Sequence, residues 1–245
     1  DIYKRLKLSE NELENAKKYA ESSEPTEEST LFAKQLMSKP EYAKLVAKIQ
    51  EQANLLPPSG AIAGIYCAND NQRGVWHAPA NMSVSGISDI NVRISDKQQG
   101  ELNEDSSGKC INAIRAFQGK GILVWGARTL DGLSSEWKYI SVRRFFNYVE
   151  ESIQESTAWA VFQPNDANTW VKVRCQIENF LSNLWRDGAL AGSTPQEAFY
   201  VRVGINQTMT AQDILNGYMI VEIGMAAVRP AEFIVLQFSH KLQES

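Results

Sequence analysis

Hydrophobic and polar residues alternate with a helical period over the first 56 residues, where Glu, Lys, Ala and Leu are frequent and glycine is scarce. Ser9 followed by Glu12 is a capping-box pattern, which predicts a helix start. Pro25 fits the first turn of a second helix that ends near Met37. We therefore expect residues 1–56 to be helical, with charges of both signs forming solvated faces.

A third helix is expected in the same region, with Ser38 as its cap and Pro40 in its first turn. The pair Pro57-Pro58 would end it. Small residues in SGAIAGIYCAND, from Ser59, predict a helix that packs closely against a sheet. A loop follows, then a weakly alternating strand, ISDINVRIS, and a polar surface loop, KQQGELNEDSSGK.

The C-terminal half shows short apolar runs and two amphipathic stretches. GILVWGA, AWAVFQ, AFYVRVG, YMIVEIGMAAV and EFIVLQFSHKL are expected to be strands. The first helix has an apolar face of Ile140, Phe145 or Phe146, Val149 and Ile153. The second has an apolar face of Trp170, Val173, Ile177, Phe180, Leu181, Leu184 and Trp185, and Gly188 is placed to end it. This order predicts an α/β (α+β) fold with a two-layer sandwich.

Composition narrows the function. With 25 basic and 29 acidic residues the net charge is -4, which argues against a nucleic-acid surface. Three widely spaced cysteines form no CxxC pair, so neither a zinc site nor a disulfide framework is expected. No apolar run reaches the roughly 20 residues that a membrane helix needs. Since the chain begins with Asp1 rather than Met, we expect a fragment of a longer protein.

Candidate chemistry is sparse. His77, in RGVWHAPAN, could act as a base with Asp70 and a distant serine, but the GxSxG nucleophile pattern is missing. Two isolated histidines cannot build a metal site. Gly108-Lys109 lacks the preceding glycine and following Ser or Thr of a phosphate loop. We therefore predict no catalytic, cofactor-binding or metal-binding residue, and expect His77 to stack on Trp76 in a loop that is stiffened by Pro79.

Two arginines lie in apolar surroundings, Arg115 in INAIRAF and Arg128 in WGARTL. An unpaired buried charge is prohibitive, so both are expected to be paired or hydrogen-bonded to backbone carbonyls and thereby to fix loops.

Several long motifs resemble the contractile tail sheath proteins of myophage tails, R-type bacteriocins and extracellular contractile injection systems. They are GVWHAPAN, GKCINAIRAFQGKGILVWGARTL, YISVRRFFNYVEESI, WAVFQPNDANTW and RPAEFIVLQF, and the resemblance runs from about Pro57 to the end. The motif residues expected to shape the family's structure are Trp76, Pro79, Asn81, Asn112, Arg115, Trp125, Gly126, Arg128, Arg143 and Arg144.

The resemblance implies three regions. Residues 1–56 would be a helical insertion or a link to an upstream region, 57–110 the end of a subtilisin-like domain without protease activity, and 111–245 the C-terminal sheath domain. Such sheaths polymerise as stacked hexameric rings around an inner tube and contract to drive it through a target envelope. The implied partners are other sheath subunits, the tube, and baseplate and terminator proteins, with no cofactor, nucleic acid or membrane insertion. The implied location is a phage tail or tail-like particle assembled in the bacterial cytoplasm.

The resemblance also implies that a terminal strand joins a neighbour's sheet. The expected arm is EFIVLQFSHKL, with alternate faces formed by Phe233, Ile234, Val235, Leu236, Gln237, Phe238, Ser239 and His240. Its alternative is an ordinary edge strand of its own subunit. Family sheaths also contribute an N-terminal arm, which the helix-forming start of this chain does not resemble.

Two other functions remain open at this point. A tail or baseplate adaptor, or a terminator, could use the same C-terminal domain. A subtilisin-like hydrolase would require a reactive serine.

Overall fold

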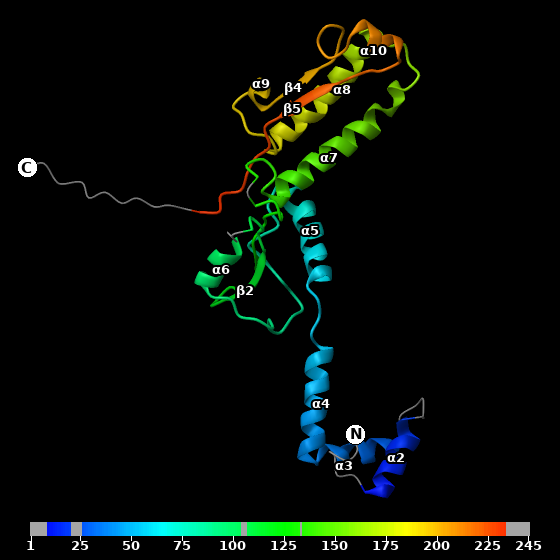
Figure 1. Ribbon diagram of the computed structural model, residues 1–245, viewed down its shortest axis with the longest axis vertical. Helices are drawn as coiled ribbons and strands as arrows, with labels where there is room; N and C mark the ends of the chain where they lie inside the picture. The colour runs from blue at the N-terminus through cyan, green and yellow to red at the C-terminus, as the bar shows by residue number, and fades with distance from the viewer. Residues whose placement is uncertain (1–8, 21–25, 104–106, 133, 234–245) are drawn as a thin grey trace, which may run out of the picture. The chain divides into compact units, whose positions relative to one another are not determined.

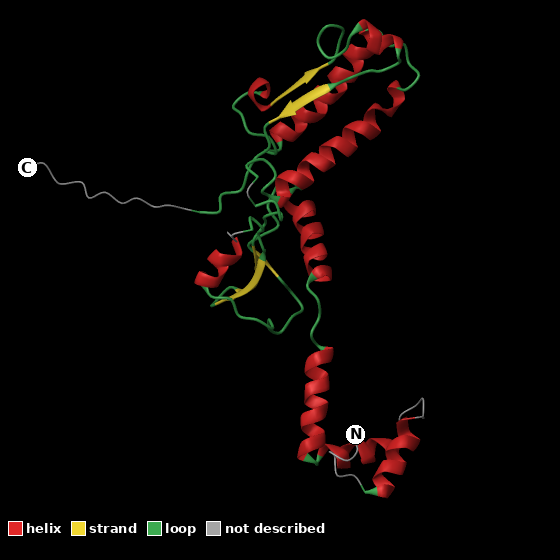
Figure 2. Ribbon diagram, viewed as in Figure 1, coloured by secondary structure: helices red, strands yellow, loops and turns green. Residues whose placement is uncertain are grey.

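The computed structural model describes residues 9–20, 26–103, 107–132 and 134–233, and these fall into two compact units, 1–58 and 59–245. Figure 1 traces the chain and Figure 2 its helices and strands. The first unit contains helices α2 (Glu10–Ala20), α3 (Glu27–Met37) and α4 (Pro40–Ala53). This is the helical pattern expected from the sequence.

The caps of the first unit agree in part with the prediction. The Ser9 hydroxyl accepts the Glu12 amide at 3.4 Å, while the Glu12 carboxylate accepts the Ser9 amide at 2.8 Å, so the capping box is confirmed. Ser38 ends α3 rather than starting α4, whose N-cap is Lys39 and whose first residue is Pro40. The prediction for Ser38 was wrong because its hydroxyl donates backward to the Gln35 carbonyl.

The second unit begins with α5 (Ser59–Arg73), the helix expected from the small residues. It continues with β1 (Met82–Ser83), α6 (Asp96–Asn103), β2 (Ala113–Phe117) and β3 (Gly121–Trp125). The three strands form an antiparallel sheet in the order β1-β3-β2, in which Ile114 pairs with Val124 and Met82 pairs with the same residue from the other side.

Two predictions fail in this part. Residues 87–95 form no strand, and the polar stretch after them begins with helix α6 instead of a loop. The physical reason is a helix N-cap. The Ser95 hydroxyl accepts a hydrogen bond from the backbone amide of Gln98 at 3.4 Å, and the Gln98 side-chain oxygen accepts one from the backbone amide of Ser95. The β2 strand was not predicted.

The remainder contains α7 (Ile140–Thr157), η1 (Ala158–Ala160), α8 (Ala167–Arg186), α9 (Pro195–Ala198), β4 (Phe199–Arg202), α10 (Ala211–Leu215) and β5 (Glu222–Met225). AWAVFQ is not a strand: it is a 3-10 turn followed by Phe162 at a φ of 65°. Since α7 continues directly into this turn, the apolar run forms the end of the helix and the turn that follows it.

Strands β4 and β5 pair antiparallel, with Val201 opposite Ile223, and the sheet packs against α8 (Figures 1 and 2). The fully buried centre of this layer contains Phe145, Val149, Ile177 and Leu181. The expected helical faces therefore cover a core, and Gly188, at a φ of 84°, ends α8 as predicted. The α+β class is confirmed, but β3 belongs to the separate β1-β3-β2 sheet and not to this sandwich.

Candidate functional site

The loop that follows α5 is a rigid junction. Gly74 has a φ of 95°, and a Cβ atom there would lie 2.5 Å from the Trp76 ring. The buried Asn69 side chain donates to the carbonyl of His77 at 3.0 Å, and Pro79 is fully buried. The Trp76 ring meets Phe145 edge-on at 6.3 Å between centroids, which ties the loop to α7.

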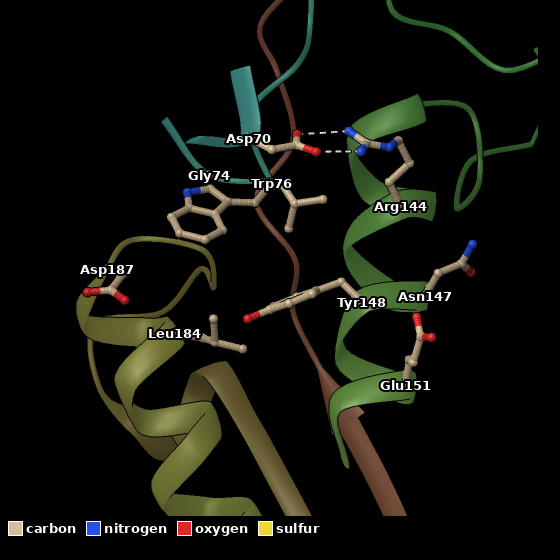
Figure 3. A pocket seen from close by; sticks show the side chains of 10 residues that line it. Asp70, Gly74, Trp76, Arg144, Asn147, Tyr148, Glu151, Leu184 and Asp187 are labelled. Atoms are coloured by element: carbon tan, nitrogen blue, oxygen red, sulfur yellow. Dashed lines mark hydrogen bonds and ion pairs between the residues drawn. The ribbon is translucent and has the colours of Figure 1, made fainter. Parts of the chain in front are cut away.

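Asp70 and Arg144 form a two-point ion pair beside this loop, with nitrogen–oxygen distances of 2.9 and 2.5 Å (Figure 3). The Arg144 guanidinium also lies over the Tyr66 ring, 4.9 Å from its centroid. The hydrogen bond to Asp70 raises the pKa of Arg144, and burial raises the pKa of Tyr66. The pair links α5 to α7, two helices that are far apart in the sequence.

This geometry bears on the alternative in which Asp70 orients His77. The Asp70 carboxylate is engaged by Arg144, and the buried Nδ1 of His77 has no hydrogen-bond partner among the described residues. The His77 ring lies beside Trp76 instead, at 5.8 Å between centroids and tilted by 42°. The arrangement is that of a packed loop.

A surface hollow of about 570 Å³ opens next to the ion pair. Figure 3 shows the Trp76 and Tyr148 rings on its walls and Asp187 at the end of α8. The described residues that line it include Glu151 and Leu184 but no serine, cysteine or histidine. The hollow therefore offers aromatic and acidic walls and no nucleophile.

Arg128 is the centre of a second cluster and is only 5% exposed. Its Nη1 donates to the carbonyl of Asn103 at 2.9 Å, and its Nε and Nη2 donate to the two carboxylate oxygens of Glu232 at 2.8 and 2.6 Å. The hydroxyl of Tyr139 donates to the same carboxylate at 3.2 Å. The hydrogen bond from Arg128 lowers the pKa of Glu232, and the same bond raises the pKa of Arg128.

The backbone of Arg128 is held as firmly as its side chain. The side-chain nitrogen of Asn112 donates to the backbone carbonyl of Arg128 at 2.8 Å. The side-chain oxygen of Asn112 accepts a hydrogen bond from the backbone amide of Arg128 at 2.9 Å. Gly126 is required here because a Cβ would lie 2.7 Å from the Asn112 oxygen. Asn112, Gly126 and Arg128, which are separate positions in the sequence motifs, thus form one unit.

The other motif residues lie in separate contacts. Arg115 donates to the carbonyl of Ile94 at 3.1 Å and to Asp96 at 2.7 Å, which is the loop-fixing role expected for it. The Trp125 ring lies 4.6 Å from the ring of Phe117. Asn81 has a φ of 56° and donates its amide to the Val124 carbonyl, and Arg143 stacks over Trp137. These residues shape local structure and do not converge with Arg128.

The predicted strand arm is described only at its start. Glu232 and Phe233 are not in a strand, and the Phe233 side chain is 73% exposed. Ile234, Val235, Leu236, Gln237, Phe238, Ser239 and His240 lie outside the described residues. The strand arm therefore stays a prediction, and Glu232 at its start binds Arg128 through its side chain.

Sequence reasoning missed Asn69 and Glu232 and did not foresee the pairing of Asp70 with Arg144. Arg144 lies 74 positions from Asp70, and Arg128 lies 104 positions from Glu232, so no local sequence pattern indicates these pairs. The one available signal was the expectation that Arg128, as an arginine in apolar surroundings, would be paired or hydrogen-bonded to backbone carbonyls.

Metal-ligand clusters and membrane-spanning helices are both absent from the described residues. No group of three or more His, Cys, Asp or Glu side chains is placed to hold a metal ion. No helix there is long and apolar enough to cross a bilayer. Cys67 and Cys175 are exposed and Cys110 is buried, and all three are free thiols.

Comparisons with known proteins point to one family. Residues 134–241 match the phage tail sheath C-terminal domain. The chain is 23% identical over 195 residues to the tail sheath protein of Vibrio phage KVP40, covering 78% of this chain and 27% of that protein. It is 25% identical over 126 residues to the tail sheath protein of Enterobacteria phage T4, covering 51% and 19%.

Solved structures are more similar. A chain of the anti-feeding prophage (AFP) baseplate is 49% identical with a TM-score of 0.71, and a chain of the PVC sheath complex in its contracted state is 47% identical with a TM-score of 0.73. Each comparison covers 76% of this chain and 51% of the other. The chain thus spans about half the length of these structures and about a quarter of the curated relative from KVP40.

Proposed function

We propose that the chain is part of a contractile sheath subunit, because its residues 134–241 match the phage tail sheath C-terminal domain. Such subunits would polymerise as stacked hexameric rings around an inner tube and contract to drive the tube through a target envelope. The observation that carries the proposal is the 47% identity to a chain of the PVC sheath complex in its contracted state. At that identity over 76% of the chain, assembly surfaces are expected to be retained along with the fold.

The described surfaces are consistent with a part that moves as a rigid body. The Asp70–Arg144 pair and the Trp76–Phe145 contact lock α5 and its loop to α7. Contraction would then re-dock rigid subunits through different surfaces, and the free energy of the stroke would come from the difference between two sets of interfaces.

Continuity of the polymer during that movement requires a link that survives it. We assign this link to the terminal segment Phe233–His240, which would add a strand to the sheet of a neighbouring subunit. Backbone hydrogen bonds would hold it, and the alternation of side chains would set its register. Subunits would stay joined while their other contacts change.

The proposed partners are other sheath subunits, an inner tube protein and baseplate and terminator proteins. The proposed location is a phage tail or tail-like particle that assembles in the bacterial cytoplasm. We propose no enzymatic activity, since the relatives are structural sheath proteins.

Electron microscopy of the full-length subunit, expressed with its tube protein, tests the proposal. Hollow tubules of stacked six-subunit rings are expected. Discrete rings or capped discs without tubules would contradict it, and would favour a baseplate adaptor or terminator. The similarity to a chain of the AFP baseplate is the observation that favours this second candidate.

A chemical test addresses the hydrolase alternative. A fluorophosphonate probe is expected to leave the protein unlabelled, because no serine is among the described residues that line the hollow beside the Asp70–Arg144 pair. Stoichiometric labelling of a single serine would overturn the structural assignment.

A further inference from the structure

The segment that follows β5 is held at three successive points. The Val228 amide donates to the carbonyl of Ala189 at 3.2 Å, and the Arg229 guanidinium donates to the carbonyl of Ser135 at 2.7 Å. The Glu232 carboxylate then accepts hydrogen bonds from the Nε and Nη2 atoms of Arg128. In Figure 1 this segment runs away from β5 toward the loops around β2 and β3. Each step therefore carries the chain further from the sandwich.

The last of these points is the strongest. Arg128 is nearly fully buried, while the Glu232 side chain is 24% exposed, and the two form a bidentate, charge-assisted pair. The arginine is positioned in advance, because Asn103 and Asn112 hold its side chain and its backbone. Removing Glu232 would leave a buried guanidinium without its carboxylate, which is unfavourable.

The pair does not serve the hydrophobic core. Among the residues that the structure describes, the core cluster of the sandwich includes none after Ala227, and Ala231 and Phe233 are exposed. A strong contact that buries no apolar surface at the end of a domain fixes position. Its effect is to fix the position of the chain at Glu232.

We propose that Arg128 is the anchor of the connecting arm: by clamping Glu232, it sets the point from which the arm leaves the subunit and so the length of the link to the neighbour. This proposal rests on the sheath function proposed above. Without the clamp the departure point would move back to Arg229, which is still bound to the carbonyl of Ser135. Three more residues would join the link, which lengthens it by up to about 10 Å.

A fixed link length matters in a polymer whose subunits re-dock together. A tight link permits only neighbour positions within its reach, so it keeps the rings in register while other contacts change. A link that is longer by about 10 Å would permit many positions. Arg128 and Glu232 are therefore positioning residues for assembly.

The first test measures the clamp in the isolated full-length subunit. Cys67→Ser leaves Cys175 on α8 as an exposed labelling site, and Phe233→Cys adds a second at the exposed end of the segment. Double electron–electron resonance between nitroxides at these sites is expected to give a narrow distance distribution. Adding Glu232→Ala should broaden it severalfold, whereas Asp89→Asn, which breaks the exposed Asp89–Arg93 pair, should leave it unchanged.

The second test measures assembly. Tubules of the Glu232→Ala subunit, studied by cryo-electron microscopy, should show a spread of helical twist at least about twice that of wild type and incomplete contraction. Deleting Ala231 and Glu232 together shortens the link by about 7 Å and, because two residues are removed, preserves which side chains face the sheet. This deletion should restore much of the order, which a defect in folding would not permit.

The results of these tests distinguish a failure of the anchor proposal from a failure of the proposed sheath function. If wild-type subunits form no tubules, the sheath function fails. If they do, the anchor is overturned by an unchanged distance distribution in Glu232→Ala, or by tubules of that variant that are ordered and contract as wild type does.

Discussion

The two units of this chain reach their structures by different routes. In the first unit the described helices α2, α3 and α4 have one buried hydrophobic residue, Leu36, while Leu31 is 61% and Leu56 is 77% exposed. In the second unit α7 and α8 bury Phe145 and Leu181 completely. Caps and periodicity are enough to specify the first unit's helices, whereas the second depends on contacts between distant segments.

The ion pairs differ in the same way. Lys39 and Glu12 pair at 2.8 Å with both side chains about a third exposed, and the pair lowers the pKa of Glu12 to about 2. In the pair of Arg128 with Glu232, the Arg128 side chain is only 5% exposed to solvent. Solvent and salt weaken the first kind of pair much more than the second. The difference teaches that the buried long-range ion pair, which resists solvent and salt, belongs to the second unit.

The largest expected effect comes from the core. Phe145→Ala should lower the free energy of unfolding of the second unit by about 3–5 kcal/mol, because it leaves a cavity among fully buried side chains. All six tryptophans lie in this unit, so urea unfolding followed by tryptophan fluorescence measures it. Leu31→Ala, at an exposed site in the first unit, should leave that transition unchanged. Equal shifts would contradict the division.

An intermediate effect is expected at the junction between α5 and α7. Arg144→Ala removes the two-point pair with Asp70 and the stacking on Tyr66, and should cost about 1–3 kcal/mol in the same assay. Lys39→Ala in the first unit should change helix content by circular dichroism only slightly, since exposed pairs contribute about 0–1 kcal/mol. A neutral Arg144→Ala would mean that α5 is not locked to α7 by this pair.

A pH dependence should follow from Glu232. Its pKa lies below the ordinary value of 4.5 because Arg128 stabilises the carboxylate, so the pair stabilises the folded state above that value and this contribution is lost as the pH falls through the lowered pKa. Wild type should exceed Glu232→Gln by about 1 kcal/mol at pH 7 and by less as the pH decreases below 4.5. A difference that stays constant down to pH 2 would contradict the pairing.

The smallest effect concerns backbone strain. Phe162 has a φ of 65° and a fully exposed side chain, so Phe162→Gly relieves strain without a loss of packing and should stabilise the second unit by about 0.5 kcal/mol. Its neighbour Val161, exposed but with a φ of -63°, is the control: Val161→Gly should destabilise by about 0.5–1 kcal/mol. Thermal unfolding of the two variants compares them, and a shift in the same direction would argue against strain at Phe162.

Local patterns predicted much of the fold and little of the site. The periodic stretches became α7 and α8, and the capping box at Ser9 and the glycine at 188 were placed correctly. AWAVFQ was misread because a short apolar run reads equally as a strand or as the end of a buried helix. The motif residues were chosen by resemblance, and nothing in their order indicated which of them would meet.

The sequence by itself determined that α7 and α8 are helices, which of their faces are apolar, and that Arg128 needed a partner, because these follow from propensity, period and the cost of an unpaired charge. Only the tertiary structure decided that the partner is Glu232, that Asp70 serves Arg144 rather than His77, and that β3 belongs to a different sheet from β4 and β5. Such pairings join residues many tens of positions apart, and they are selected by how the whole domain packs.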